Sequence, residues 1–401
     1  MKRYFEAFSR KLIWRALSHL KIGHLTIEFE GKIKHFGQLD HSDLSVHVHI
    51  HSPAFFRRIL LNGSVGAGES FMLGEWTVSD LTLFIRLMIK NSAALKATEG
   101  ALAKFGMAWQ AFYYRLKPNT VTGAKKNIIK HYDLGNDFFA TFLDKKMMYS
   151  AAVYPTATAT LEDAASYKLQ VICEKLKLKP GDKVLEIGTG WGGLALYAAQ
   201  HYGCEITTTT ISEAQYTWAH QAIQSANLGH KIHLLKEDYR MLTGRYDKIV
   251  SIEMIEAVGH RYLGTYLKKL ASLLTENGQI LIQAICISDQ HYERAKYEAD
   301  FIKQYIFPGG FLPSLTAIAS TLTEKTNLRI IGVEDIGLHY AKTLFDWRQR
   351  FIEATDQIMA MGYSLIFFRM WIYYLCYCEA AFLEQYISDF QIVMIKSGNQ
   401  L

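Results

Sequence analysis

The stretch VLEIGTGWGGLALYAA, residues 184–199, joins a short apolar run to a group of glycines and then to a helical pattern. The apolar residues Val184, Leu185 and Ile187 predict a strand, and the apolar spacing after the glycines predicts a helix. A glycine-rich turn between a strand and a helix is typical of a site for a nucleotide-type ligand, because the backbone can approach the ligand closely. Two ligands suit this shape: a dinucleotide that carries hydride, and an adenosyl sulfonium that carries a methyl group.

The residues around the glycines distinguish these two ligands. Gly188, Gly190 and Gly193 satisfy the dinucleotide pattern G-x-G-x-x-G, but that pattern also needs an acidic residue about 20 positions on to bind the ribose. The second predicted strand ends instead in TTTTIS, residues 207–212, which contains no carboxylate. Glu186 precedes the first glycine and gives E-x-G-x-G-x-G, the usual form of the adenosylmethionine loop. The sequence therefore favours a methyl donor over a dinucleotide.

Strands and helices alternate from about residue 165 onward, which predicts a doubly wound α/β domain. Runs such as KIVSIEM and QILIQAICI are almost continuously apolar, as expected for strands that are buried on both faces. The predicted elements are helix 162–177, strand 183–188, helix 192–202, strand 205–211, helix 212–226, strands 231–236 and 246–253, helix 260–274 and strand 278–287, followed by strands in LRIIGVEDIG and QIVMIK. Aromatic-rich insertions at 288–327 and 338–390 predict a helical lid over the carboxyl ends of the strands.

The N-terminal part has a different pattern and predicts a small α+β domain, so we expect one domain at 1–120 and a second at 121–401. Residues 1–22 have an amphipathic pattern with many basic residues. This pattern suits either a helix packed on its own domain or a helix that lies on anionic lipid. The runs LTIEFEG, LSVHVHIHS and FFRRILLNG predict strands, and the following segment AGESFMLGEW predicts a turn that leads into helices.

Histidine and cysteine positions bear on metal binding. His47, His49 and His51 alternate along one predicted strand, which favours a solvent-facing strand edge over a metal site because no cysteine or carboxylate cluster accompanies them. The five cysteines are scattered and lack the spacing of a zinc site. The sequence therefore predicts no metal and a reducing, cytosolic compartment.

Composition and charge exclude several classes of protein. Half of the 401 residues are apolar and a fifth are charged, which is globular composition. The net charge of +6 suits an anionic partner, but the basic and aromatic residues 100–130 carry no RNA-binding signature, so we expect no nucleic-acid partner. The first residues lack the pattern of a signal peptide. Arg369 and Glu379 interrupt the most apolar late stretch, so no transmembrane segment is predicted.

Several motifs in order resemble those of bacterial cyclopropane-fatty-acyl-phospholipid synthases. They are HYDLGNDFFATFLDKKMMYSAAVYP, LEIGTGWGGLALYAA, TTTTISEAQ, EDYR, YDKIVSIEMIEAVGHRYL and YIFPGGFLPS. The resemblance runs from about residue 125 to the C-terminus, and GESFMLGEW extends it more weakly to the family's small N-terminal domain. It implies a Rossmann-like class I methyltransferase domain that transfers the methyl group of S-adenosylmethionine to the cis double bond of an unsaturated phospholipid. It also implies a cytoplasmic enzyme, peripheral at the inner face of the membrane surface, and leaves a homodimer open.

The resemblance further implies which residues contact S-adenosylmethionine. They belong to the motif MYS, to the glycine loop, to the motif TISEAQ that replaces the missing ribose carboxylate, and to the motif EDYR where the adenine is expected. The complete set is Tyr149, Ser150, Glu186, Gly188, Gly190, Gly192, Thr210, Ile211, Gln215, Asp238 and Tyr239.

The resemblance also implies the chemistry that follows methyl transfer. Attack by the alkene gives a carbocation on the acyl chain, and loss of a proton from the added methyl group closes the ring. In the family a bound bicarbonate takes part, and Glu256, Ile285 and Tyr340 match three of its ligands. Ala151 stands at the position of a cysteine ligand and Gln283 at that of a histidine ligand, which puts bicarbonate binding in question. Aromatic faces can stabilise the cation, and the candidates are Tyr305, Phe307, Phe311, Tyr340, Phe345 and Trp347.

Two outcomes stay open if bicarbonate is not bound. Glu256 can act as the base if burial raises its pKa toward neutrality, whereas His260 is better explained as a capping or surface residue. Alternatively, a hydride shift and loss of a chain proton leave a methyl-branched or methylene acyl chain, as in lipid C-methyltransferases. A small-molecule N-methyltransferase is disfavoured by the basic amphipathic ends and the N-terminal domain. A non-catalytic lipid-binding protein is disfavoured by the intact glycine loop with Glu186 and Glu256.

Overall fold

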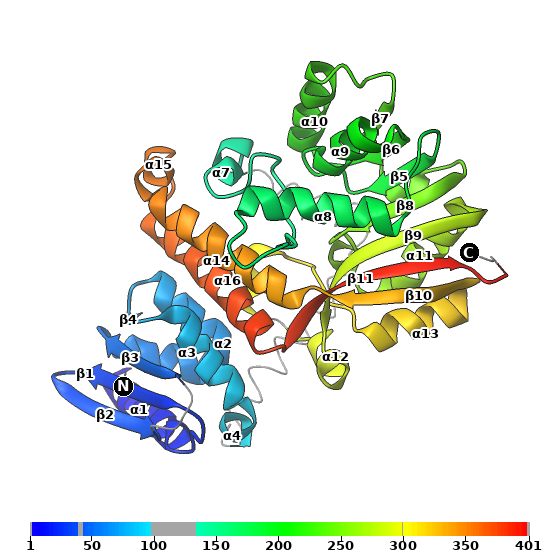
Figure 1. Ribbon diagram of the computed structural model, residues 1–401. Coiled ribbons are helices and arrows are strands. Elements are labelled where there is room, and N and C mark those ends of the chain that lie inside the picture. The colour runs from blue at the N-terminus through cyan, green and yellow to red at the C-terminus, as the bar shows by residue number, and fades with distance from the viewer. Residues whose placement is uncertain (1, 39–42, 98–133, 299, 399–401) are drawn as a thin grey trace. The chain divides into compact units, whose positions relative to one another are not determined.

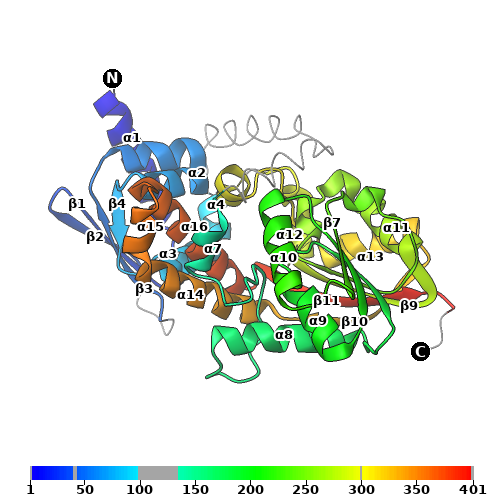
Figure 2. The ribbon, with the colours of Figure 1, turned by 90° about the horizontal axis from the view of Figure 1, so that it is seen from above.

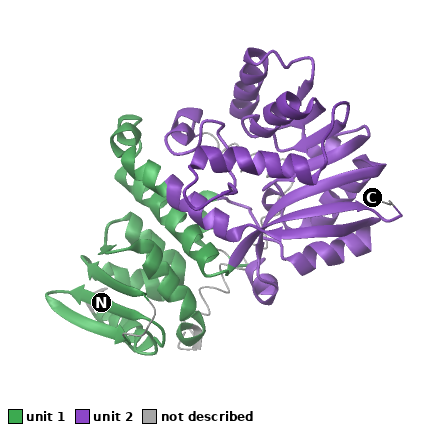
Figure 3. Cartoon of the chain, viewed as in Figure 1, with its two compact units in different colours: residues 1–117, 297–306, 348–386 green, residues 118–296, 307–347, 387–401 purple. Residues whose placement is uncertain are grey.

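The computed structural model describes residues 2–38, 43–97, 134–298 and 300–398. The chain forms two units, and each is described here by itself (Figure 3). Unit 1 comprises residues 1–117, 297–306 and 348–386, and unit 2 comprises residues 118–296, 307–347 and 387–401. Two late segments thus group with the N-terminal residues, so one boundary near residue 120 does not divide the units. The basic and aromatic pattern at 100–130 lies outside the described residues, and the lid over the strand ends stays a prediction.

Unit 2 is built on a seven-stranded sheet with the order β10-β11-β9-β8-β5-β6-β7 (Figure 1). The strands from β9 to β7 are parallel, and β11 is antiparallel to both of its neighbours. The strands are β5 (Lys183–Ile187), β6 (Glu205–Thr209), β7 (Ile232–Leu235), β8 (Tyr246–Ile252), β9 (Leu274–Ile287), β10 (Leu328–Asp335) and β11 (Ile387–Lys396). The chain order reverses between β5 and β8, and such a switch point is where open α/β sheets bind ligands.

Helices cover both faces of this sheet, as Figure 2 shows. One face carries α8 (Leu161–Lys175), α9 (Gly193–Tyr202) and α10 (Glu213–Ser225), and the other carries α11 (Leu263–Leu273) and α13 (Leu315–Lys325). On β5, Val184 belongs to the hydrophobic cluster that packs the sheet against α8, α9 and α10. Leu185 and Ile187 belong to the cluster that packs the opposite face against α11 and α13. The remaining helical elements in the described part of unit 2 are α7 (Asn136–Ala140), η1 (Tyr239–Met241), η2 (Ile255–Ala257), η3 (His260–Tyr262), α12 (Asp289–Ala295) and most of α14 (Gly337–Glu353).

The doubly wound α/β prediction is confirmed, and the predicted elements between 161 and 287 agree with the observed ones to within a few residues. Local signals explain this agreement. Thr160 and Asp163 form a capping box at the start of α8, and Gly192 (φ 92°) and Gly203 (φ 71°) flank α9. The main difference is the predicted helix 260–274, which begins with the separate 3-10 turn η3.

Unit 1 contains a four-stranded sheet with the order β2-β1-β3-β4. Its strands are β1 (His24–Phe29), β2 (Lys32–Gly37), β3 (Ser45–Ile50) and β4 (Trp76–Val78). The helices that the structure describes in this unit are α1 (Lys2–Leu17), α2 (Ala54–Met72), α3 (Leu81–Lys90), α4 (Ser92–Ala97), the π-helix η4 (Ile302–Ile306), α15 (Thr355–Ala360) and α16 (Leu365–Leu383). The predicted N-terminal helix packs on its own unit, because the Trp14 ring stacks on Phe36 at 5.3 Å between centroids. Its binding to lipid stays a prediction.

The structure corrects two expectations for unit 1. The run FFRRILLNG is not a strand but the start of α2. Its apolar pairs, residues 55–56 and 59–60, lie four positions apart, which is a helical spacing. His47 and His49 alternate outward on β3 as predicted, and His51 follows the end of the strand. Because β3 lies between β1 and β4, the histidines of β3 occupy a solvent-facing side of the sheet and not its edge. Among the described residues no group of histidine, cysteine or acidic side chains could hold a metal ion.

One helix of unit 1, α16, is long and apolar enough by composition to cross a membrane, among the residues that the structure describes. Half of its most apolar window is buried, and the helix packs against α2 and α3. Within it, Glu379 accepts hydrogen bonds from Arg348 Nε at 3.0 Å and from Thr82 Oγ1 at 3.1 Å. A buried ion pair and packing against two neighbouring helices are typical of a core helix, and we interpret α16 in this way.

Candidate functional site

The glycine loop lies at the carboxyl end of β5, beside the switch point of the sheet. Gly188, Gly190 and Gly192 all have positive φ, at 102°, 55° and 92°, which glycine adopts without strain. The amides of Gly188 and Thr189 donate to the Thr209 carbonyl at 3.1 and 3.0 Å, which ties the loop to β6. A Cβ added at Gly190 would meet no atom within 4 Å. The loop therefore presents open space in front of Gly190, as a methyl-donor site requires.

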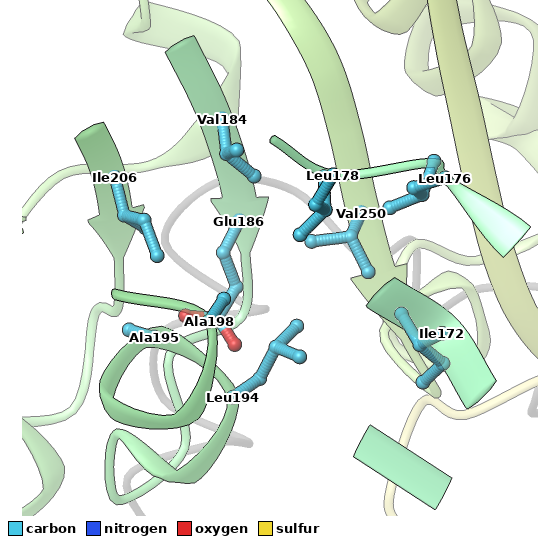
Figure 4. Close-up of a pocket in the computed structure, with 10 residues that line it drawn as sticks. All are labelled: Ile172, Leu176, Leu178, Val184, Glu186, Leu194, Ala195, Ala198, Ile206 and Val250. Atoms are coloured by element: carbon cyan, nitrogen blue, oxygen red, sulfur yellow. The ribbon is translucent and has the colours of Figure 1, made fainter. Parts of the chain in front are cut away.

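Glu186 is buried behind the loop and does not face that open space. Its Oε2 accepts from Thr208 Oγ1 at 2.5 Å, and Thr208 also bonds to Thr189 Oγ1 at 2.7 Å. Burial raises the pKa of Glu186 to about 8, and the Thr208 bond opposes that rise. Figure 4 shows its carboxyl in a small core cavity that is otherwise apolar, lined by Ile172, Leu176, Leu178, Val184, Leu194, Ala195, Ala198, Ile206 and Val250. Glu186 thus supports the loop from inside the core.

The expected ribose residues come together at the start of α10. Thr210 Oγ1 donates to Gln215 Oε1 at 2.8 Å, and both side chains are buried. Ser212 caps α10 by accepting from the Gln215 amide, and Ile211 lies half-buried between these residues. This arrangement fixes the turn that follows β6.

The expected adenine residues have partners of their own. Arg240 donates to both carboxylate oxygens of Asp238, at 2.8 and 2.6 Å. Burial raises the pKa of Asp238, but the Arg240 bonds outweigh it and hold the pKa below its ordinary value. Tyr239 packs its ring on Tyr266, 5.5 Å between centroids, at the margin of a core cluster. Asp238 is therefore ionised and oriented, whereas the Tyr239 ring is committed to packing.

The motif MYS lies on a strained loop that contacts the glycine loop. Asp144 accepts from the amides of Lys146 and Met148, both at 2.8 Å, and Met147 between them has a φ of 56°. Met148 packs so closely on Gly193 that an added Cβ would lie 2.4 Å from its sulfur. This contact places the following residues, Tyr149 and Ser150, near the carboxyl end of β5.

Aromatic rings from three segments of unit 2 gather around Tyr149. Its ring centroid lies 5.3 Å from that of Trp347, 5.2 Å from Phe139 and 6.4 Å from Phe307, and Trp347 lies 6.1 Å from Tyr340. Other predicted cation-stabilising residues lie elsewhere. Phe311 belongs to a core cluster, Phe345 is 40% exposed, and Tyr305 lies in unit 1, where it donates to Glu69.

The four predicted catalytic residues converge on two carboxyl groups. Glu256 Oε1 accepts from the Ile285 amide at 2.5 Å. Gln283 Nε2 and Tyr340 Oη each donate to Glu253, both at 2.8 Å. The amide of Ala151 donates to the same Glu253 carboxylate at 2.7 Å. The structure therefore brings Glu256, Gln283, Ile285 and Tyr340 together, but it centres three of the contacts on Glu253.

Burial sets the charge of these carboxyl groups. Burial, and then the charge of Glu253, raises the pKa of Glu256 to about 8. Glu256 Oε2 is buried and has no hydrogen-bond partner among the described residues. Burial also raises the pKa of Glu253, but the Ala151 amide, Lys168, Tyr340 and Gln283 all oppose that rise. At neutral pH Glu256 is therefore protonated, and the donors around Glu253 favour its ionised form.

Sequence reasoning missed three members of this cluster: Glu253, Asp389 and Lys168. Asp389, on β11, accepts from Gln283 Nε2 at 2.8 Å, and Lys168, on α8, is fully buried and donates to Ser150 Oγ at 2.7 Å. Burial lowers the pKa of Lys168, whereas the charges of Glu253 and Asp144 oppose this. A signal for Glu253 was available, because the run SIEMIE puts two glutamates directly after a buried strand.

Comparison with known proteins agrees with this geometry. The family described as mycolic acid cyclopropane synthetase matches residues 120–392. The chain is 37% identical over 368 residues to the tuberculostearic acid methyltransferase of Mycobacterium tuberculosis, which covers 87% of this chain and 83% of that protein. It is 35% identical over 348 residues to the cyclopropane-fatty-acyl-phospholipid synthase of Escherichia coli, covering 86% and 87%. A solved mycolic acid cyclopropane synthase complexed with SAH and CTAB is 28% identical, with a TM-score of 0.64 over 68% of this chain and 98% of that one.

Proposed function

Because the chain belongs to the mycolic acid cyclopropane synthetase family and is an S-adenosylmethionine-dependent methyltransferase that acts on lipid, we propose that it methylates the cis double bond of an unsaturated phospholipid acyl chain and closes a cyclopropane ring. One observation carries the proposal. A cluster of buried carboxyl groups and aromatic rings lies at the carboxyl ends of β8 and β9, beside the glycine loop after β5. Such a site can bind an apolar chain, stabilise a cation and remove a proton.

The residues around the glycine loop fit the methyl donor. Gly190 faces open space, and the buried pair Thr210 and Gln215 fixes the turn at the end of β6, where the ribose of such a ligand is expected. Tyr149 and the carboxylate of Asp238 complete the set that we propose to bind it. When bound, S-adenosylmethionine supplies an electrophilic methyl group on a sulfonium.

The aromatic rings suit the acyl chain and its cation. Trp347 is fully buried. Its ring centroid lies 5.3 Å from that of Tyr149 and 6.1 Å from that of Tyr340. Ring faces attract a cation by about 2 kcal/mol when the site excludes water. We propose that these three rings stabilise the carbocation formed when the alkene attacks the methyl group.

Glu256 is proposed to orient the site and not to act as the base. A carboxyl group with a pKa of about 8 carries a proton at neutral pH and cannot accept another. Its bond to the Ile285 amide instead fixes the end of β9 against η2. Its Oε2 is buried and has no hydrogen-bond partner among the described residues.

A methyl-branched or methylene product is the second candidate, because the relative at 37% identity is named a tuberculostearic acid methyltransferase. The two products differ in the fate of the cation: direct loss of a proton from the added methyl group closes the ring, whereas a hydride shift before proton loss gives the branched or methylene chain. The lipid substrate also suggests that the enzyme works at the cytoplasmic face of the membrane, where the net charge of +6 favours anionic lipid. A homodimer stays a prediction.

Lipid analysis tests the proposed function. The protein is expressed in cells that make unsaturated phospholipid, and fatty-acid methyl esters are analysed by mass spectrometry and NMR. A gain of one CH2 with loss of the alkene signal and appearance of ring protons would support cyclopropanation. A gain of one CH2 with a branch methyl signal would support the second candidate. Unchanged acyl chains, with S-adenosylmethionine consumed on added amines, would overturn both.

A further inference from the structure

Glu253 combines strain, burial and an unusual set of donors. It follows β8 directly and has a φ of 47°, a conformation that a non-glycine residue adopts at a cost and that persists only where the surroundings enforce it. Its amide donates to the Gln283 carbonyl at 2.8 Å, which fixes this backbone. The backbone and the carboxylate of Glu253 are therefore both held in place. Residues with a strained backbone of this kind are concentrated at functional sites.

Three donors from separate parts of the chain converge on the Glu253 carboxylate. The Ala151 amide (2.7 Å) and Gln283 Nε2 (2.8 Å) donate to Oε1, and Tyr340 Oη donates to Oε2 at 2.8 Å. Together they bind both oxygens of one planar O–C–O group. We propose that the Glu253 carboxylate is the catalytic base of this enzyme, in the place that a bound bicarbonate takes in relatives, so that the enzyme does not use bicarbonate.

The structure argues against a separate anion at these donors. Each of the three already binds the side chain of Glu253, and Glu256 Oε1 already occupies the Ile285 amide. A further anion would also lie among the buried carboxyl groups of Glu253, Glu256 and Asp389, and burying an unpaired charge there is costly. Bicarbonate therefore does not fit this site.

The two departures from the family pattern agree with a carboxylate supplied by the chain. Ala151 has no polar side chain, but a carboxylate needs only its backbone amide. Gln283 cannot exchange a proton at neutral pH, yet its amide can donate to Glu253 and to Asp389 at the same time, both at 2.8 Å. The side-chain oxygen of Gln283 accepts from Gln391 Nε2 at 3.1 Å, which turns the NH2 group toward the two carboxyl groups, so that Gln283 donates to the base.

The inference rests on the proposed function and specifies its proton transfer. The alkene electron pair forms a bond to the methyl carbon as the carbon–sulfur bond breaks, which leaves a carbocation on the acyl chain. Glu253 then takes one proton from the added methyl group. The electron pair of that carbon–hydrogen bond forms the second carbon–carbon bond of the ring, and Glu253 becomes a carboxylic acid that returns its proton to solvent. No other reactant is needed.

Two variants test this role. Purified protein is given vesicles of unsaturated phosphatidylglycerol and labelled S-adenosylmethionine in buffer freed of carbon dioxide. The wild type should turn over equally with and without added bicarbonate. Glu253→Gln should bind S-adenosylmethionine normally by calorimetry but turn over about a hundredfold or more slower. Glu174→Gln, which changes an exposed glutamate of α8, is the matched control.

Glu253→Gly adds a chemical-rescue experiment to the test. Glycine adopts a φ of 47° without strain, so this variant should fold while it vacates the three donors. Added bicarbonate should then restore part of its turnover. Carbon-13 bicarbonate should show line broadening with Glu253→Gly and none with the wild type, which reports binding without relying on activity.

The outcomes separate this inference from the proposed function. Wild-type turnover that falls when bicarbonate is removed, line broadening of bicarbonate by the wild type, or full turnover by Glu253→Gln would each overturn the inference alone. A wild type that methylates no vesicle lipid at any bicarbonate concentration would overturn the proposed function. The bicarbonate binding measurement would still decide whether Glu253 excludes the anion.

Discussion

Replacing Glu256 with glutamine is expected to stabilise the protein at neutral and alkaline pH. Burial, and then the charge of Glu253, raises the pKa of Glu256 from 4.5 to about 8. Between these values the folded state binds more protons than the unfolded state, so stability falls as the pH rises. One pKa unit corresponds to about 1.36 kcal/mol, so ionisation of Glu256 lowers the free energy of unfolding by about 3 kcal/mol at pH 7 and about 5 kcal/mol above pH 8.

Glutamine removes this pH dependence and keeps the shape of the side chain. Its carbonyl can accept the Ile285 amide bond, and its NH2 group resembles the protonated oxygen. The variant should match the wild type near pH 4.5 and exceed it by about 3 kcal/mol at pH 7. Equilibrium urea unfolding, followed by tryptophan fluorescence at several pH values from 4.5 to 8.5, measures the difference. Glu174→Gln, at an exposed position of α8, is the matched control for a glutamate-to-glutamine change. A stability difference that stays constant with pH would refute the reasoning, because it would come from packing and not from ionisation.

Three further substitutions test other parts of the site. Lys168→Met leaves buried carboxylates without their cation and should lower the free energy of unfolding at pH 7 by about 3–5 kcal/mol, measured by urea unfolding. An unchanged free energy of unfolding would mean that this lysine is neutral in the folded protein. Tyr340→Phe removes a bond to ionised Glu253 worth about 1.5–3 kcal/mol, so the acid limb of the pH–rate profile should move up by about one to two units, with turnover recovered at high pH. An unmoved limb would exclude this coupling. Gly190→Ala places a methyl group in open space at a φ of 55°, where alanine is strained, so the variant should fold with lower stability and bind S-adenosylmethionine about tenfold more weakly in calorimetry. Equal affinity would place the donor elsewhere.

The fold of the α/β unit was predictable because the sequence patterns that specify its strands and helices are local. Strands buried on both faces read as continuous apolar runs, and glycines and capping residues mark the helix ends, as Thr160 and Gly203 do for α8 and α9. The grouping of residues 348–386 with residues 1–117 was not predictable, since it depends on packing between segments far apart in sequence. The run FFRRILLNG was assigned wrongly because its apolar residues were read as a strand, although their spacing is helical.

The site was predictable only where a motif carried it. Glu256, Gln283 and Tyr340 were assigned through the resemblance, and the structure brings them together. Lys168 was missed because a lysine in an amphipathic helix is normally exposed. Asp389 was missed because it reaches the cluster through the antiparallel pairing of β11 with β9, which no local pattern reveals.

The two glutamates after β8 differ in the number of hydrogen bonds that favour their ionised forms. Three donors and Lys168 oppose the rise that burial causes in the pKa of Glu253, whereas Glu256 receives one backbone donor and keeps one oxygen without a partner among the described residues. Two carboxyl groups in one buried site cannot both ionise cheaply, so a proton on Glu256 also favours the charge on Glu253. A substitution that ionised Glu256 would therefore raise the pKa of Glu253. The pairing keeps one base ready near neutral pH, and the stability lost by burying Glu256 is a consequence of the same arrangement.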